Sequence, residues 1–172
     1  KCVVAEKDFG RNEIAELIEW AKANGAKGLA WMRVTEKGLE SSIVKFFSTE
    51  IQKHLLQKTK AKKGSVIFFV ADKKKKVAEV LGKLRLELAR RLGLQKAGEF
   101  RFCWVKDFPL FEWNDEEDRW EAAHHMFTAP KQEHVELLEK APEKVQGNLY
   151  DLVLNGTELG SGSIRINDPE LQ

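Results

Sequence analysis

The stretch from Tyr150 to Asp168, YDLVLNGTELGSGSIRIND, predicts a β-hairpin. The dipeptide Asn155–Gly156 between two apolar runs is typical of a type I′ turn with a two-residue loop. In a regular hairpin this loop pairs Asp151 with Gly160. Because side chains alternate along each strand, Asp151 and Glu158 would then share one face as diagonal neighbours, roughly 7–8 Å apart at Cα.

Two carboxylates this close repel each other unless a cation lies between them. Divalent ions such as Mg²⁺ bind oxygen ligands, commonly one or two carboxylates together with the phosphates of a substrate. Asp151 and Glu158 are therefore a candidate metal site. The competing interpretation is that one acid faces solvent and the other pairs with a lysine.

Arg165 lies seven residues beyond Glu158, and strict alternation would place it on the opposite face. The intervening GSGS segment (160–163) changes this expectation, because glycine within a strand marks a bulge or a close approach of the backbone. One bulge there would bring Arg165 onto the face of Asp151 and Glu158, where its guanidinium could bind a carboxylate with two donors. Otherwise Arg165 is an ordinary surface or structural residue.

The segment EAAHHMFTAP contributes His124 and His125. If they continue a strand, they point to opposite sides, so they form a poor chelate and a zinc site is weakly supported. We then expect one histidine to face a site and the other to pack or meet solvent. Two purely structural histidines are the alternative. His54 and His134 look like surface positions.

Around the hairpin, residues after about 95 read as antiparallel strands, with a turn at NDEED (114–118). One helix is predicted in APKQEHVELLEKAP, with Val135, Leu137 and Leu138 on its apolar side.

The earlier part alternates helices and short strands around a small sheet. Its predicted elements are a helix beginning near residue 11 with Asn12 as cap and Gly25 as stop, a strand over 28–34, a helix over 48–59 with Ile51, Leu55 and Leu56 inward, a strand over 65–71, and a helix capped by Asp72 that buries Val77, Val80, Leu81, Leu84, Leu88 and Leu92.

The net charge of +2 conceals a contrast between the two parts of the chain. Residues 1–98 carry 22 Lys and Arg against 11 Asp and Glu, whereas residues 99–172 carry 7 against 16. A basic part next to an acidic part suggests two domains with different partners, and basic domains often bind nucleic acid. A lysine-rich solvated surface explains the same excess equally well.

No apolar run is long enough for a membrane span, and no secretory signal pattern opens the chain. Cys2 and Cys103 lie far apart without a CxxC motif, which fits free thiols in a reducing compartment. These features favour a soluble globular protein.

Two long segments resemble the catalytic domain of the bacterial-type aspartyl-tRNA synthetases, a class II family. They are RFCWVKDFPLFEWNDEEDRWEAAHHMFTAPK and YDLVLNGTELGSGSIRINDPELQ. The earlier GAKGLAWMRV, GLESSIVKFFS and GSVIFFVADKKKKVAEVLGKLRLELARRLGL resemble the GAD domain that this family inserts into its catalytic domain. The resemblance covers essentially the whole chain, and one departure is Met126, where the family is associated with proline.

The resemblance implies an α+β fold: an α/β GAD domain over residues 1–95, then part of an antiparallel catalytic sheet with a flanking helix over 96–172. It also implies roles for site residues. His124 and Arg165 would bind L-aspartate, Glu158 would bind ATP, and Asp151 with Glu158 would hold Mg²⁺. The implied reaction activates aspartate with ATP and transfers it to the 3′ end of tRNA(Asp), in a cytoplasmic, homodimeric enzyme with no membrane association.

The family's motifs 2 and 3, which carry phosphate-binding arginines, have no counterpart here. We therefore expect an incomplete catalytic unit that is inactive alone, in which no catalytic residue is assigned. A non-catalytic RNA-binding module remains an alternative, because GAD domains also occur in a subunit of tRNA-dependent amidotransferases. Residues 99–172 distinguish the two, since the HHMFTAP and ELGSGSIRI segments resemble the synthetase.

Overall fold

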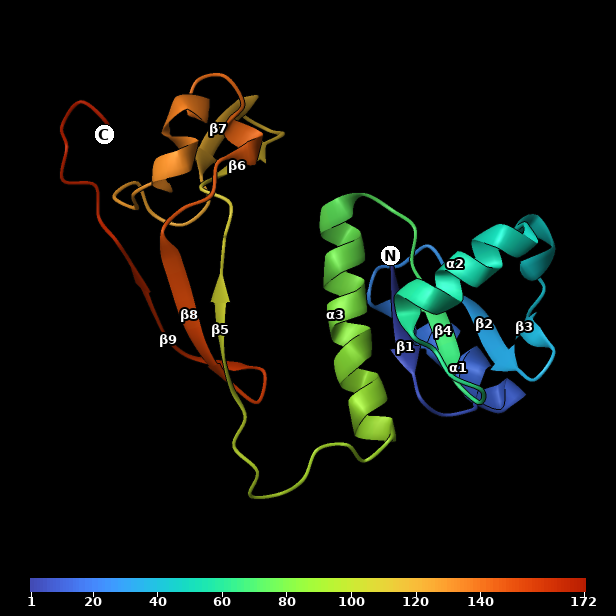
Figure 1. The fold of residues 1–172 in the computed structure, drawn as a ribbon. Helices are drawn as coiled ribbons and strands as arrows, with labels where there is room; N and C mark the ends of the chain where they lie inside the picture. Colours follow the sequence, from blue (N-terminus) through green and yellow to red (C-terminus); the bar gives the residue numbers. More distant parts are fainter. The chain divides into compact units, whose positions relative to one another are not determined.

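The computed structural model describes all residues from 1 to 172, and its chain divides into two compact units, Lys1–Ala97 and Gly98–Gln172 (Figure 1). The division falls close to the boundary expected near residue 95. Helices occur together with antiparallel sheets, which confirms the α+β class. None of the helices combines the length and the apolar composition that a membrane crossing requires.

The first unit is built on a four-stranded antiparallel sheet with the order β1-β4-β2-β3. Its central strand β4 alternates regularly: Val66 and Phe68 belong to one apolar cluster, and Ile67 and Phe69 to another on the opposite face. The sheet therefore has a core on both sides. The strands are β1 Cys2–Ala5, β2 Ala30–Thr35, β3 Gly38–Glu40 and β4 Val66–Phe69.

Two helices, α1 (Arg11–Ala23) and α3 (Lys74–Arg91), cover one face of this sheet. Each carries an apolar stripe with helical spacing, and burying such a stripe is what stabilises helices in globular domains. The predicted stripe of α3 is confirmed, with Leu92 partly buried at its end. The buried residues of α3 are Val77, Val80, Leu81, Leu84 and Leu88.

The predicted caps of α1 and α3 were wrong. Helix α1 is capped by Gly10, because the Glu13 carboxylate accepts a hydrogen bond from the Gly10 backbone N–H at 2.7 Å. At α3 the Asp72 carboxylate accepts from the N–H of Lys73, which is itself the cap residue.

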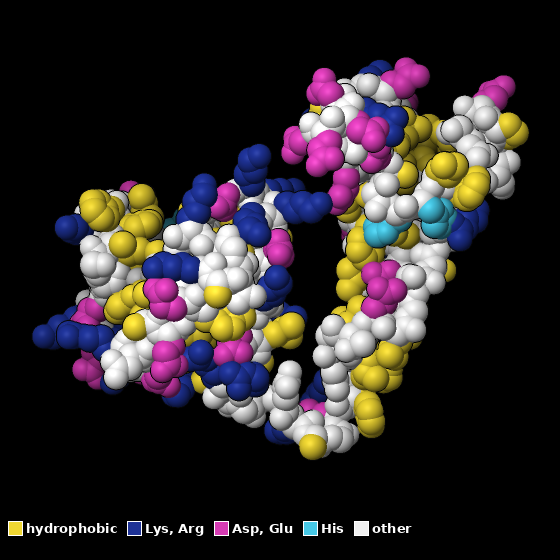
Figure 2. Space-filling model, turned by 180° about the vertical axis from the view of Figure 1, so that it is seen from behind, with side chains coloured by type: hydrophobic (Ala, Val, Ile, Leu, Met, Phe, Trp, Pro, Cys, Tyr) yellow, Lys and Arg dark blue, Asp and Glu magenta, His cyan; other side chains and the backbone are white.

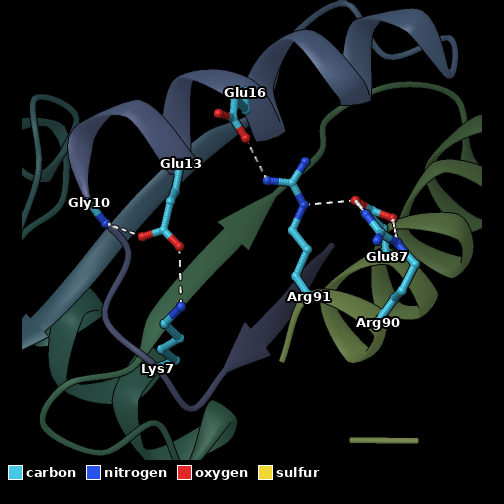
Figure 3. Close-up of polar contacts among 7 residues, drawn as sticks. All are labelled: Lys7, Gly10, Glu13, Glu16, Glu87, Arg90 and Arg91. Atoms are coloured by element: carbon cyan, nitrogen blue, oxygen red, sulfur yellow. Dashed lines mark hydrogen bonds and ion pairs between the residues drawn. The ribbon is translucent and has the colours of Figure 1, made fainter. Parts of the chain in front are cut away.

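A group of charged contacts joins the middle of α1 to the C-terminal turn of α3 (Figure 3). Arg91 lies between two acids, with Nη1 3.1 Å from Glu16 and Nε 2.7 Å from Glu87. Arg90 donates to Glu87 as well, through Nε at 2.9 Å and Nη2 at 2.8 Å. The hydrogen bonds from Arg90 and Arg91 lower the pKa of the Glu87 carboxyl to about 2, so it is charged at neutral pH.

The opposite face of the sheet is covered by α2 (Thr49–Thr59) and the 3₁₀ turn η1 (Val44–Phe46). Ser48 caps α2 by accepting from the Ile51 N–H. Leu55 and Leu56 pack inward as predicted, but Ile51 is 52% exposed, which corrects that expectation. The partly buried stripe repeats at positions 52, 55, 56 and 59, and Ile51 lies at its border.

The second unit holds a three-stranded sheet, β5-β8-β9, and a separate two-stranded ribbon, β6-β7, all antiparallel. The turn predicted at residues 114–118 joins β6 to β7. The strands are β5 Phe102–Lys106, β6 Phe111–Asn114, β7 Arg119–Ala122, β8 Leu149–Leu154 and β9 Thr157–Ser163.

The helix predicted between β7 and β8 is replaced by two 3₁₀ turns, η2 (Gln132–Leu137) and η3 (Pro142–Lys144). Val135 and Leu138 are three residues apart, which is the 3₁₀ repeat, and Leu138 N–H donates to the Val135 carbonyl. His134 is partly buried, and its Nδ1 accepts from the Gln146 N–H at 3.1 Å, so it is not a simple surface residue.

Candidate functional site

The hairpin that begins the site has the predicted turn. Asn155 and Gly156 have φ values of 49° and 87°, both positive, as a type I′ turn requires. The Asn155 side chain also joins the turn to the start of β5. It accepts from the Arg101 N–H at 2.9 Å and donates to the Glu99 carbonyl at 2.8 Å.

A register shift occurs in this hairpin, one residue before the GSGS segment. Val153 pairs with Glu158 as expected, but Leu152 pairs with Gly160, so Leu159 is the extra residue of a bulge. Asp151 consequently pairs with Ser161 and not with Gly160, which corrects the regular register.

Because of this bulge, each side chain after Leu159 points to the opposite face from the one that a regular register would give it. Asp151 still shares a face with Glu158, and that face now continues through Ser161 and Ser163. Arg165, two residues further, follows on the same side. Its backbone is fixed opposite Thr128 by an antiparallel bridge, in which Ala129 N–H donates to Ile164 and Ile166 N–H donates to Phe127.

One open pocket of about 290 Å³ collects these side chains. Figure 2 views this face of the second unit, where histidine side chains lie near acidic ones. All four residues that the sequence singled out line the pocket, although they come from two segments separated by more than 20 residues. The lining residues are His124, His125, Thr128, Leu149, Asp151, Glu158, Ser161, Gly162, Ser163 and Arg165.

Both histidines line the pocket, so the expectation that they face opposite ways was wrong. The strand β7 ends at Ala122, and His124 and His125 lie in the bend that follows it. The Nη1 atom of Arg165 is 2.7 Å from Nδ1 of His125 and also contacts Nε2. The His124 ring packs edge-on against Phe108, with ring centroids 5.2 Å apart.

Neither Asp151 nor Glu158 forms an ion pair within residues 1–172, so no lysine of this chain neutralises them. Asp151 is half-buried and Glu158 is exposed. No group of three or more His, Cys, Asp or Glu side chains is arranged to hold a metal ion. Two free carboxylates on one wall fit Mg²⁺ that arrives with phosphate ligands, because that ion needs only one or two protein carboxylates.

The sequence did not single out Thr128 and Ser163, which also line the pocket. Thr128 is only 2% exposed, and its hydroxyl has no hydrogen-bond partner. The Ser163 hydroxyl is also buried without a partner. The alternation of serine and glycine before Arg165 was a usable signal for Ser163, because residues two apart share a face. Thr128 had no such signal, since its position depends on a bridge to a distant segment.

One lining glycine lies close to an aromatic ring. Gly162 pairs with Tyr150, and a Cβ added there would stand 2.9 Å from the tyrosine ring. The ring thus covers the glycine on the side of the sheet away from the pocket.

Comparison with known proteins finds similarity in both parts of the chain. Residues 2–81 match the GAD domain. The chain is 53% identical over 168 residues to the aspartate–tRNA ligase of Macrococcus caseolyticus, covering 98% of the chain and 28% of that relative. The aspartate–tRNA(Asp/Asn) ligase of Treponema denticola is 51% identical over 95% of the chain. That of Brachyspira hyodysenteriae is 50% identical over 100% of the chain.

Over nearly its whole length, the chain is similar to one segment of the bacterial aspartate–tRNA ligases. It spans 28% of the length of the first two relatives and 30% of the third. The similarity to these synthetases includes the second unit and hence the whole pocket. A GAD domain alone would account for the first unit only.

Proposed function

We propose that this chain is the part of an aspartate–tRNA ligase that binds L-aspartate and contributes to the binding of ATP. The enzyme activates aspartate to aspartyl-adenylate and transfers it to the 3′ end of tRNA(Asp). The observation that carries the proposal is the single pocket in which a guanidinium, two histidines and two unpaired carboxylates meet.

Arg165 is proposed to hold the side-chain carboxylate of aspartate. Its guanidinium offers parallel N–H donors that match a carboxylate, and the resulting charge-assisted pair is not available to the neutral amide of asparagine. His125 lies beside this guanidinium, with its ring Nδ1 2.7 Å from Arg165 Nη1. His124, on the same wall, is proposed to contact the bound amino acid.

Glu158 and Asp151 are proposed to face the nucleotide. Mg²⁺ held by these carboxylates would neutralise charge on the phosphates of ATP. The two acids lie on neighbouring strands of one sheet face, on the side to which the bulge also brings Arg165. The pocket therefore separates a cationic end for the amino acid from an acidic end for metal and nucleotide.

The complete enzyme is proposed to be a cytoplasmic homodimer. Names of the relatives support aspartate and tRNA as its substrates. A non-catalytic RNA-binding module fits less well, because the similarity to the ligases extends over the second unit and its pocket.

This chain alone should not activate aspartate. Its sequence has no counterpart of motifs 2 and 3 with their phosphate-binding arginines, and electrostatic clamps of that kind are typically the largest catalytic contribution. The test is aspartate-dependent exchange of pyrophosphate into ATP, measured on the purified chain and on the full-length protein that carries it. Exchange by the full-length protein alone is expected. Exchange by the isolated chain would refute the claim that the chain is an incomplete catalytic unit. Absence of exchange in both proteins would refute the proposed function.

A further inference from the structure

The outer side of α2 and its flanking segments form a basic surface. Residues 44–63 contain six lysines and a single acid, Glu50. We call the exposed lysines of this segment, together with the Phe46 ring, the α2 surface. Its lysines are Lys45, Lys53, Lys58, Lys60 and Lys62.

Ion pairing sets these lysines apart from several cations of α1 and α3. The paired cations of α1 and α3 include Lys22 with Glu19, Lys83 with Glu79, and Arg91 with Glu16 and Glu87. None of the five lysines of the α2 surface has an acidic partner, whereas the sixth lysine of the segment pairs with an acid of the β2–β3 turn. Ion pairs within the chain therefore leave the positive charge of these five lysines uncompensated.

An aromatic ring lies exposed within this charge. Phe46 is 73% exposed, more than any other large apolar residue of the chain. The Nζ of Lys45 stands 5.2 Å from the centre of its ring. A phenylalanine left open to water beside lysines offers a stacking face next to phosphate-binding groups.

The apolar side of α2 is already occupied. Leu55 and Leu56 pack against the sheet, so the helix has no second apolar stripe with which to enter a bilayer. Lys53 lies on α2 and Lys60 is its C-cap residue, and both are exposed.

We propose that the α2 surface binds RNA, with the lysines on phosphates and the Phe46 ring stacked on an unpaired base. The affinity of such binding depends little on the base sequence, because every base has a face that can stack and lysine contacts only the phosphate backbone. The site is separate from the aspartate pocket. The choice of RNA over other polyanions rests on the proposed function.

The test uses this chain and a labelled 12-nucleotide oligouridine, followed by fluorescence anisotropy over a range of salt concentrations. Lys53→Gln with Lys58→Gln should weaken binding roughly tenfold at low salt and reduce the slope of log affinity against log salt by about 1.4, or ~0.7 for each lost phosphate contact. Phe46→Ala should weaken binding at least about fivefold and leave that slope unchanged, because stacking releases no counterions.

The matched control is Arg11→Gln with Lys74→Gln, which removes the same charge from the helix starts of α1 and α3. It should bind within about twofold of the unchanged chain, since neither residue belongs to the α2 surface. Equal losses in both double variants would overturn the proposal in favour of a diffuse charge effect. Absence of RNA binding at low salt would overturn it too, as would binding to anionic phospholipid vesicles in preference to RNA. Unchanged thermal midpoints exclude unfolding as the cause.

Discussion

Thr128 combines almost complete burial with an unsatisfied hydroxyl in the pocket wall. A buried donor without a partner destabilises the protein that contains it, so such groups mark places where a ligand or an ordered water completes the hydrogen bonding. Its neighbour across the bridge is Arg165, the proposed ligand of the substrate carboxylate.

Replacing Thr128 with valine keeps the shape and removes the unpaired hydroxyl. We expect the second unit to become more stable by up to about 1 kcal/mol, because the desolvation penalty of the hydroxyl disappears. Hydrogen exchange of the β8 and β9 amides measures this change. Thr157→Val, at an exposed position of the same hairpin, is the control and should change stability by less than about 0.5 kcal/mol. Clear destabilisation by Thr128→Val would mean that the hydroxyl has a protein partner after all.

Single residues differ in how well the sequence predicts them. The facing of Arg165 followed from counting residues and allowing one bulge near a glycine-rich segment. The position of the bulge at Leu159 did not, because glycine marks where a bulge is tolerated and packing decides where it occurs. The paired facing of the histidines was missed because their bend interrupts the strand period on which the inference relied.

At the scale of elements, the charged contacts at the C-terminal turn of α3 make a pH-dependent contribution to stability. The folded pKa of Glu87 is lowered to about 2, from 4.5. A carboxyl with a lowered pKa stabilises the fold above its unfolded pKa, and this stabilisation is lost as the pH falls from about 4.5 toward 2. Its side chain is 11% exposed, although that of its partner Arg90 is 68% exposed, so solvent weakens the pair.

Glu87→Gln should therefore lower the free energy of unfolding of the first unit by about 1–2 kcal/mol at pH 7. The difference from the unchanged chain should shrink at pH 3 and below. Urea unfolding at both pH values measures it. Glu19→Gln, which removes a surface pair with Lys22, should have an effect below about 0.5 kcal/mol. A pH-independent difference for Glu87→Gln would contradict the assigned cause.

Among whole elements, long periodic helices were the most predictable. The stripe of α3 specifies both its helix and its buried face, and the Asn155–Gly156 turn specifies its hairpin. The segment around Val135 was mispredicted because its few apolar residues suit a 3₁₀ repeat as well as an α-helical one, and only its tertiary contacts choose between them.

For the molecule as a whole, apolar burial is unevenly divided. Of the buried apolar residues, only Leu110, Val145 and Leu149 belong to the second unit. That unit also leaves Phe102 and Trp104 each 60% exposed on β5. The sequence indicated the division into two parts through the contrast in charge and the change from alternating helices and strands to antiparallel strands. The balance between the two cores depends on which strands face each other, and composition does not reveal this.

The central claim is that a bulge places Arg165 in one pocket with Asp151 and Glu158, at its amino-acid end. Arg165→Lys keeps the charge but loses the planar fork, and Arg165→Leu removes the cation. In the full-length protein, either change should lower kcat/KM for aspartate about 30- to 1,000-fold, which corresponds to about 2–4 kcal/mol. The margin over asparagine should shrink, while the KM for ATP should stay within about threefold.

Aspartate-dependent pyrophosphate exchange, with aspartate and ATP varied separately, is the most direct test. Arg119→Lys, an exposed arginine on β7 of the same unit, serves as the control and should behave like the unchanged protein. The account predicts a large loss specific to aspartate in both Arg165 variants. An unchanged kcat/KM for aspartate, or an equal loss in the use of ATP, would contradict it.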